Sequence, residues 1–115
     1  MRVRAIAEQG VRRLRFEGHG DLDLHCADDV KNRALALIDG SENIVFDLEN
    51  VTFVDSAGLG VLVSLYKHTR THGRGANFIG VQPAVMQVLE IIKLDRIFEL
   101  YPDLESATEA LRAAS

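Results

Sequence analysis

The stretch Val51–Gly60 constrains the fold most, because its pattern is typical of a corner between a strand and a helix. An apolar strand is predicted to end at Asp55, and a helix is predicted to begin at Ser56. Ser56 would then stand where the first N–H groups of a helix lack partners within the helix and carry partial positive charge. Gly58 and Gly60 follow, and each weakens a helix by about 1 kcal/mol relative to alanine. We therefore expect another molecule to approach the bare backbone at this corner.

The rest of the chain alternates between apolar runs typical of strands and longer stretches with helical periodicity. Strands are predicted at residues 2–7, 11–18, 44–48 and 76–81 and within 97–100, and helices at 28–38, 56–72, 83–92 and 106–114. This order, β-β-α-β-α-β-α-β-α, predicts an α/β fold with four or five strands in a mostly parallel sheet and about four helices. The opening hairpin makes the sheet mixed.

Two helix boundaries have specific signals. Gly40 is predicted to end the first helix, and Ser106-Ala-Thr-Glu109 is typical of a capping box that opens the last helix. The chain contains no internal repeat, low-complexity tract or linker, so we expect residues 1–115 to form one domain.

Composition narrows the classes of function. The formal net charge of −4 argues against nucleic acid as the main partner, because phosphate binding needs a basic face. Cys26 is the only cysteine, which excludes an internal disulfide and favours a reducing compartment such as the cytoplasm. No apolar run approaches the roughly 18 residues of a membrane span, so we expect none. The sequence leaves the oligomeric state open.

The corner lacks the motifs of the common enzymes. Val54 occupies the first glycine position of a hydrolase nucleophile elbow, and Val63 stands where a dinucleotide fingerprint needs glycine or alanine. There is no Walker lysine. His68 and His72 could share a helical face, but favourable charge at a helix C-terminus explains them more simply than a metal. We expect no catalytic residue, metal or cofactor, although nucleotide binding at the helix N-terminus remains an alternative.

The role of Ser56 stays open on local chemistry alone. Serine is a preferred N-cap residue, so the hydroxyl could simply close the start of the helix. That interpretation leaves the two following glycines and the preceding Asp55 without an explanation. The alternative is that the Ser56 hydroxyl is a reactive group of a functional site.

The string Asp-Ser-Ala-Gly-Leu-Gly at residues 55–60 resembles the signature of STAS domains, specifically of the anti-sigma factor antagonists. Gly20–Asp23 resembles the Gly-Glu-Leu/Ile-Asp turn of that family, with Asp21 in place of the usual glutamate. The segments 44–48 and 81–85 resemble its central strand and a later join between strand and helix. The likeness covers nearly the whole chain.

The resemblance implies a non-enzymatic module that binds a serine-kinase anti-sigma factor and thereby frees the sigma factor. The kinase would then phosphorylate Ser56 and break the complex, and a PP2C-type phosphatase would restore it. The residues expected in the contact surface are Asp23, Asp55, Ser56, Ala57, Gly58 and Gly60.

The chain departs from the family at two places. Ala57 replaces a second serine, which leaves one acceptor, and Ile92–Leu94 replaces a common Ser-Gly-Leu turn. A second hypothesis within the fold is a STAS subunit of a stress-signalling scaffold or of a membrane transporter.

Overall fold

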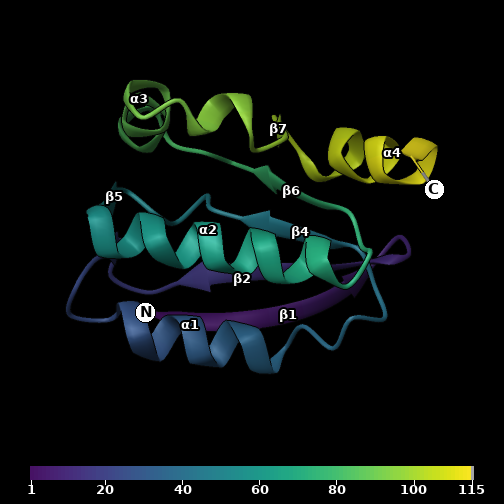
Figure 1. Ribbon diagram of the computed structural model, residues 1–115, viewed down its shortest axis with the longest axis horizontal. Helices are drawn as coiled ribbons and strands as arrows, with labels where there is room; N and C mark the ends of the chain where they lie inside the picture. The colour runs from purple at the N-terminus through teal and green to yellow at the C-terminus, as the bar shows by residue number, and fades with distance from the viewer. Residues whose placement is uncertain (115) are drawn as a thin grey trace.

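The computed structural model describes residues 1–114 and confirms an α/β fold with a mixed sheet between helical layers (Figure 1). The elements are β1 (Arg2–Glu8), β2 (Val11–Glu17), β3 (Asp21–Leu22), α1 (Ala27–Ala36), β4 (Ile44–Asp47), β5 (Phe53–Val54), α2 (Ser56–Thr71), β6 (Ala76–Ile79), α3 (Pro83–Ile91), the 3-10 helix η1 (Leu94–Arg96), β7 (Leu100–Tyr101) and α4 (Leu104–Ala114). The predicted hairpin and the predicted helix from Ser56 are both present.

The main sheet has five strands in the order β1-β2-β4-β6-β7. β1 and β2 pair antiparallel, and every other neighbouring pair is parallel. Right-handed crossovers that step along a sheet in one direction place their helices on the same face. Accordingly α1, α2 and α3 contribute to one core cluster, whereas α4 packs against the other face.

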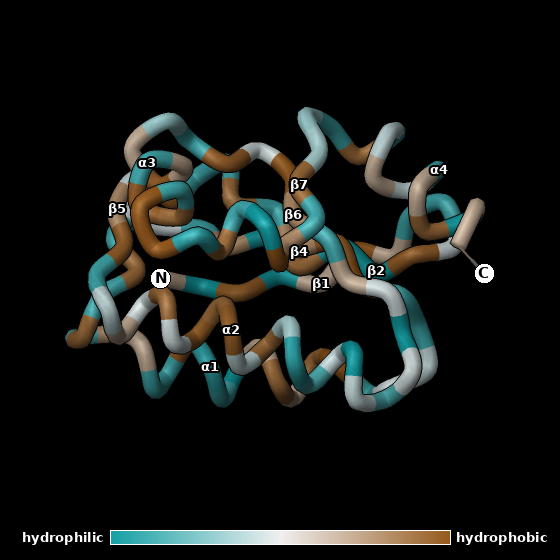
Figure 2. The backbone as a smooth tube through the Cα atoms, turned by 45° about the horizontal axis from the view of Figure 1, so that its top comes forward, coloured by the Kyte–Doolittle hydropathy of each residue, from teal (hydrophilic) through white to brown (hydrophobic). Residues whose placement is uncertain are grey.

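β4 and its neighbour β6 are buried along their whole length. All four residues of β4 are buried, as expected for a nearly continuous apolar run with helices on both faces. On the side of α1, α2 and α3, Phe46 stacks on Phe78 with ring centroids 5.0 Å apart, and Phe98 stacks on Phe78 at 4.4 Å. Figure 2 shows hydrophobic and hydrophilic residues alternating along α1 and α2, which is the pattern of helices with one buried side.

A second, two-stranded sheet lies at the corner before α2. β3 pairs in parallel with β5, with Asp21 opposite Phe53 and Leu22 opposite Val54. The apolar strand that was expected to end at Asp55 is therefore short and lies outside the main sheet. This pairing brings the loop that follows β3 to the start of α2.

Gly58 has a structural explanation within the chain. A Cβ built on Gly58 would lie 1.9 Å from the carbonyl oxygen of Leu22, so only glycine lets β3 approach α2 this closely. The close approach expected at this position therefore comes from the protein's own backbone. Gly60 differs, because nothing lies within 4 Å of a Cβ built there.

The prediction that Gly40 ends the first helix is wrong. α1 already ends at Ala36, because the N–H of Leu37 turns back to the carbonyl oxygen of Ala34 at 3.0 Å and tightens the last turn. Gly40 lies in the following loop, where it has a φ of 82°.

Two boundaries near the C-terminus also differ from the prediction. β7 begins at Leu100, later than the expected strand within 97–100, because η1 forms first and Phe98 is buried in the aromatic cluster. The last helix begins before Ser106, since the carboxylate of Asp103 accepts a hydrogen bond from the Ser106 N–H at 2.9 Å. The capping-box interpretation of Ser106 is therefore wrong.

The two glycines of α2 should respond in opposite directions to the same substitution. Gly58→Ala should lower the free energy of unfolding by about 1–3 kcal/mol, because the new methyl group collides with the Leu22 carbonyl. Gly60→Ala should raise it by up to about 1 kcal/mol, since the site is open and alanine favours the helix. Urea denaturation followed by circular dichroism measures both. Unchanged or raised stability of Gly58→Ala would contradict the packing described at Gly58, and a loss of stability in Gly60→Ala would contradict the open site at Gly60.

Candidate functional site

Asp55, not Ser56, is the N-cap of α2. Asp55 has extended backbone angles, and its Oδ1 accepts a hydrogen bond from the Gly58 N–H at 2.9 Å. The interpretation of Ser56 as the cap is therefore wrong, because the aspartate before it already satisfies this donor. The sequence already offered Asp55 as a cap, because aspartate and serine are both preferred N-cap residues and the two are adjacent.

Ser56 is the first residue of α2 and is exposed. Within residues 1–114, no hydrogen bond or ion pair holds its hydroxyl. The neighbouring Ala57 is half-buried and Gly60 is exposed. The corner therefore presents a free hydroxyl and bare backbone to solvent.

The second carboxylate oxygen of Asp55 reaches across to a different segment. Oδ2 accepts a hydrogen bond from the N–H of Leu24 at 2.9 Å, and Leu24 lies in the loop between β3 and α1. The N–H groups of Gly58 and Leu24 stabilise the charged carboxylate, so they hold the pKa of Asp55 below its ordinary value. Asp55 is consequently ionised at neutral pH and joins the start of α2 to this loop.

Asp23 belongs to the same loop and shapes its turn. Its Oδ1 accepts the N–H of His25 at 3.0 Å, and its carbonyl oxygen accepts the N–H of Ala27 at 2.8 Å. The structure therefore brings Asp23 and Asp55 to one corner, linked through the backbone of Leu24. The Asp23 side chain is half-buried and is used within its own turn.

A groove runs between α1 and α2 beside this corner. It has a volume of about 260 Å³, and its lining includes Leu24, Ala27 and Lys31 on one side and Ala57, Gly60 and Val61 on the other. Leu24 is 74% exposed and is the large apolar side chain at the surface that lines this groove. Sequence reasoning missed Leu24, because its exposure follows from how the loop is held.

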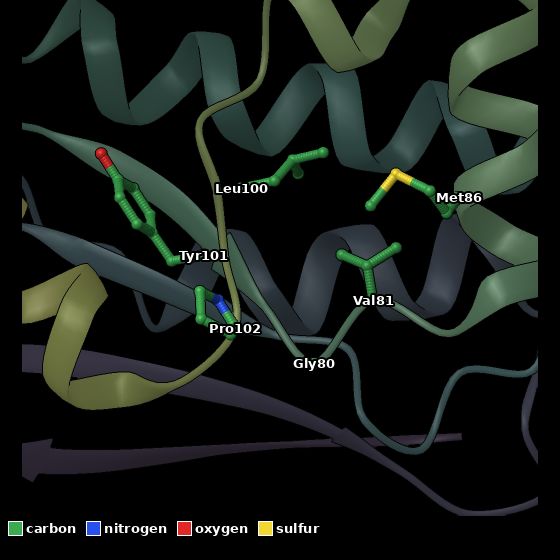
Figure 3. A pocket seen from close by; sticks show the side chains of 6 residues that line it. All are labelled: Gly80, Val81, Met86, Leu100, Tyr101 and Pro102. Atoms are coloured by element: carbon green, nitrogen blue, oxygen red, sulfur yellow. The ribbon is translucent and has the colours of Figure 1, made fainter.

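A second cavity, also of about 260 Å³, lies where β6 and β7 end (Figure 3). Val81, Met86 and Leu100 point toward one another, whereas the hydroxyl of Tyr101 points away from them. The lining contains no carboxylate, imidazole or thiol, and it includes none of the candidate residues. This cavity therefore offers no set of groups for acid–base or nucleophilic chemistry.

The described part of the chain shows no metal-binding cluster. Among residues 1–114, no three histidine, cysteine or acidic side chains are close enough to share an ion. The rings of His68 and His72 lie 4.5 Å apart, and Nδ1 of His72 is 2.8 Å from the carbonyl oxygen of His68. In the same part of the chain, no helix has the length and apolarity needed to cross a bilayer.

Comparison with protein families identifies a known domain. The model of the STAS domain matches residues 3–107. The chain is 33% identical over 98 residues to the anti-sigma F factor antagonist of Paenibacillus polymyxa, covering 84% of each chain. It is 34% identical over 83 residues to the anti-sigma-B factor antagonist of Listeria monocytogenes, covering 70% of this chain and 72% of that one.

Solved structures share the fold along most of the chain. A putative anti-sigma factor antagonist from Thermotoga maritima superposes with a TM-score of 0.83 at 26% identity, covering 96% of this chain and 94% of that one. An anti-sigma factor antagonist from Mycobacterium paratuberculosis gives a TM-score of 0.83 at 27% identity, covering 96% and 93%. The murine anion transporter Slc26a9 shares the fold alone, at 18% identity over 18% of its chain. Together the family match, the relatives and the fold show that this chain belongs to the STAS domain family.

Proposed function

We propose that this chain is an anti-sigma factor antagonist that binds a serine-kinase anti-sigma factor while Ser56 is unphosphorylated. Binding frees the sigma factor, and phosphorylation of Ser56 by the same kinase ends it. A PP2C-type phosphatase restores the binding form. The names of the two relatives described above, at 33% and 34% identity, support this assignment. The chain acts by binding and not by catalysis, in the bacterial cytoplasm.

The observation that carries the proposal is the free Ser56 hydroxyl at an exposed corner. Asp55 caps α2, so the Ser56 hydroxyl has no structural role that would keep it from a kinase. Ala57 follows it, which leaves one hydroxyl in the first turn of α2. A single phosphate acceptor gives a switch with two states, the unphosphorylated form and the form phosphorylated at Ser56.

The proposed contact surface consists of the corner and the groove beside it. Ser56, Ala57 and Gly60 lie on the α2 side, and Asp23 and Asp55 hold the loop opposite. Gly58 is buried beneath this surface and contributes by letting β3 and α2 pack closely. The partner therefore meets a surface whose shape depends on all six residues.

Electrostatics explains how one phosphate could release the partner and leave the fold intact. Phosphoserine carries about −1.5 to −2 charges at neutral pH. The N-terminus of a helix tolerates such a charge, because unpaired N–H groups and the helix dipole favour anions. In an interface, like charges brought together cost several kcal/mol, and about 1.4 kcal/mol is a tenfold change in affinity. The ionised Asp55 already places one negative charge at the corner.

Charge at Ser56 should weaken partner binding far more than removal of the hydroxyl. Ser56→Ala should bind candidate anti-sigma kinases from the same genome within about threefold of wild type, whereas Ser56→Asp should bind at least about tenfold more weakly. Isothermal titration calorimetry measures the dissociation constants. Thr71→Asp adds the same charge at the far end of α2 and should bind like wild type. Equal affinity of Ser56→Asp and Ser56→Ala would refute the proposed switch.

Phosphate should be transferred to Ser56. Incubation with the binding kinase, Mg²⁺ and ATP should add one phosphoryl group to wild type and none to Ser56→Ala, because Ser56 offers the free hydroxyl of the corner. Mass spectrometry of proteolytic fragments locates the group. Phosphate on another residue, or undiminished labelling of Ser56→Ala, would show that the acceptor is misassigned.

A further inference from the structure

We propose that Asp55 is a positioning residue for partner binding, and that it acts by holding Leu24 as the apolar anchor onto which the anti-sigma factor docks. This inference rests on the proposed function and adds a specific contact and its support to it. The occupant that we assign to the groove beside Leu24 is one apolar side chain of the anti-sigma factor.

Leu24 is suited to be an anchor. It is 74% exposed, it lies in the loop joined to the Ser56 corner, and it lines the groove between α1 and α2. Complete burial of a leucine side chain on binding corresponds to roughly ten- to hundredfold in affinity. An anchor delivers this gain only if it is held in place before the partner arrives, because ordering a loop during binding opposes association.

The groove next to Leu24 has room and mixed chemistry. Ala27 and Ala57 provide small apolar walls, and Gly60 adds no side chain that would fill the space. Asp28 and Lys31 line it with opposite charges, as at the polar rim of an interface. A single apolar side chain with polar neighbours fits this arrangement, and Ala57, the residue after Ser56, joins the groove to the corner.

One hydrogen bond controls the position of the anchor. Among the described residues, the bond between Asp55 Oδ2 and the Leu24 N–H is the one that joins residues 23–26 to the start of α2. The other hydrogen bonds of this loop, such as the one that the His25 N–H donates to the Asp23 carboxylate, stay within residues 21–30. Loss of the Asp55 bond should therefore free Leu24 and leave the turn itself formed.

The two oxygens of Asp55 allow its two roles to be separated. Oδ1 caps α2 and Oδ2 holds Leu24. Asparagine is also a preferred N-cap, but its amide has one oxygen and cannot reproduce both contacts. Asp55→Asn should therefore keep the helix cap and release Leu24. Asp103→Ala is the matched control, because it removes a carboxylate that likewise accepts an N–H in the first turn of a helix, α4.

A double-mutant cycle tests the proposal directly. Leu24→Ala should weaken binding to the anti-sigma kinase about tenfold, and Asp55→Asn should weaken it several-fold. The double variant should bind within about twofold of Leu24→Ala, because Asp55 acts through the side chain that is already absent. Asp103→Ala should bind like wild type. If the fold-change in dissociation constant of the double variant equals the product of the two single fold-changes, the two residues act independently and the proposal is overturned.

Hydrogen exchange supplies a readout that needs no partner. The Leu24 amide should exchange at least about tenfold faster in Asp55→Asn than in wild type or Asp103→Ala, because its hydrogen bond is lost. Unchanged exchange would refute the tether. Wild-type binding that is weakened by Ser56→Asp but not by Leu24→Ala would refute the anchor and leave the proposed function standing. Failure of wild type to bind any candidate kinase would overturn both.

Discussion

The fold depends on the burial of β4 on both faces. Its four residues, including Asp47, have helices or neighbouring strands around them, so the strand cannot be stable without layers on each side. Arg13 and Arg15 each approach the buried Asp47 carboxylate within 3.7 Å, which compensates its charge. With β4 at the centre, the parallel strands end at one edge of the sheet, and the segments that lead into α2 and α3 lie at that edge.

This arrangement explains why the candidate site lies at a corner outside the main sheet. β3 and β5 form a small sheet outside the main one, and their pairing brings a distant loop to the start of α2. Gly58 lets the backbones touch, and Asp55 links them with one carboxylate. Among the described residues no hydrogen bond holds the Ser56 hydroxyl, so the phosphate that we propose there should leave the fold intact.

The sequence predicted most of the fold because its signals were local. The apolar run of β4 and the helical periodicity of α2 each appear within one short window, and the 55–60 string marked the corner. The prediction failed where a contact joins distant segments. The approach of Leu22 to Gly58 joins residues 36 apart, and the bond from Leu24 to Asp55 joins residues 31 apart, so no local pattern encodes either contact.

The starts of α2 and α4 also show where prediction from the sequence fails, here over only a few residues. Asp55 precedes Ser56, and Asp103 precedes Ser106, so each helix start offered two suitable caps close together. In both cases the aspartate accepts the hydrogen bond. A carboxylate forms a stronger charge-assisted bond to an N–H than a hydroxyl does, and it also interacts favourably with the helix dipole. The N-cap preferences of aspartate and serine are nearly equal, so they alone do not identify the cap.

The most direct test of this account is a comparison of the purified phosphorylated and unphosphorylated proteins. Denaturation measures the free energy of unfolding of each form, and titration with the anti-sigma kinase measures the dissociation constant of each. We expect the phosphate on Ser56 to change the unfolding free energy by less than about 1 kcal/mol and to weaken binding at least about tenfold. A phosphorylated protein that unfolds, or one that binds as tightly as the unmodified form, would contradict the account.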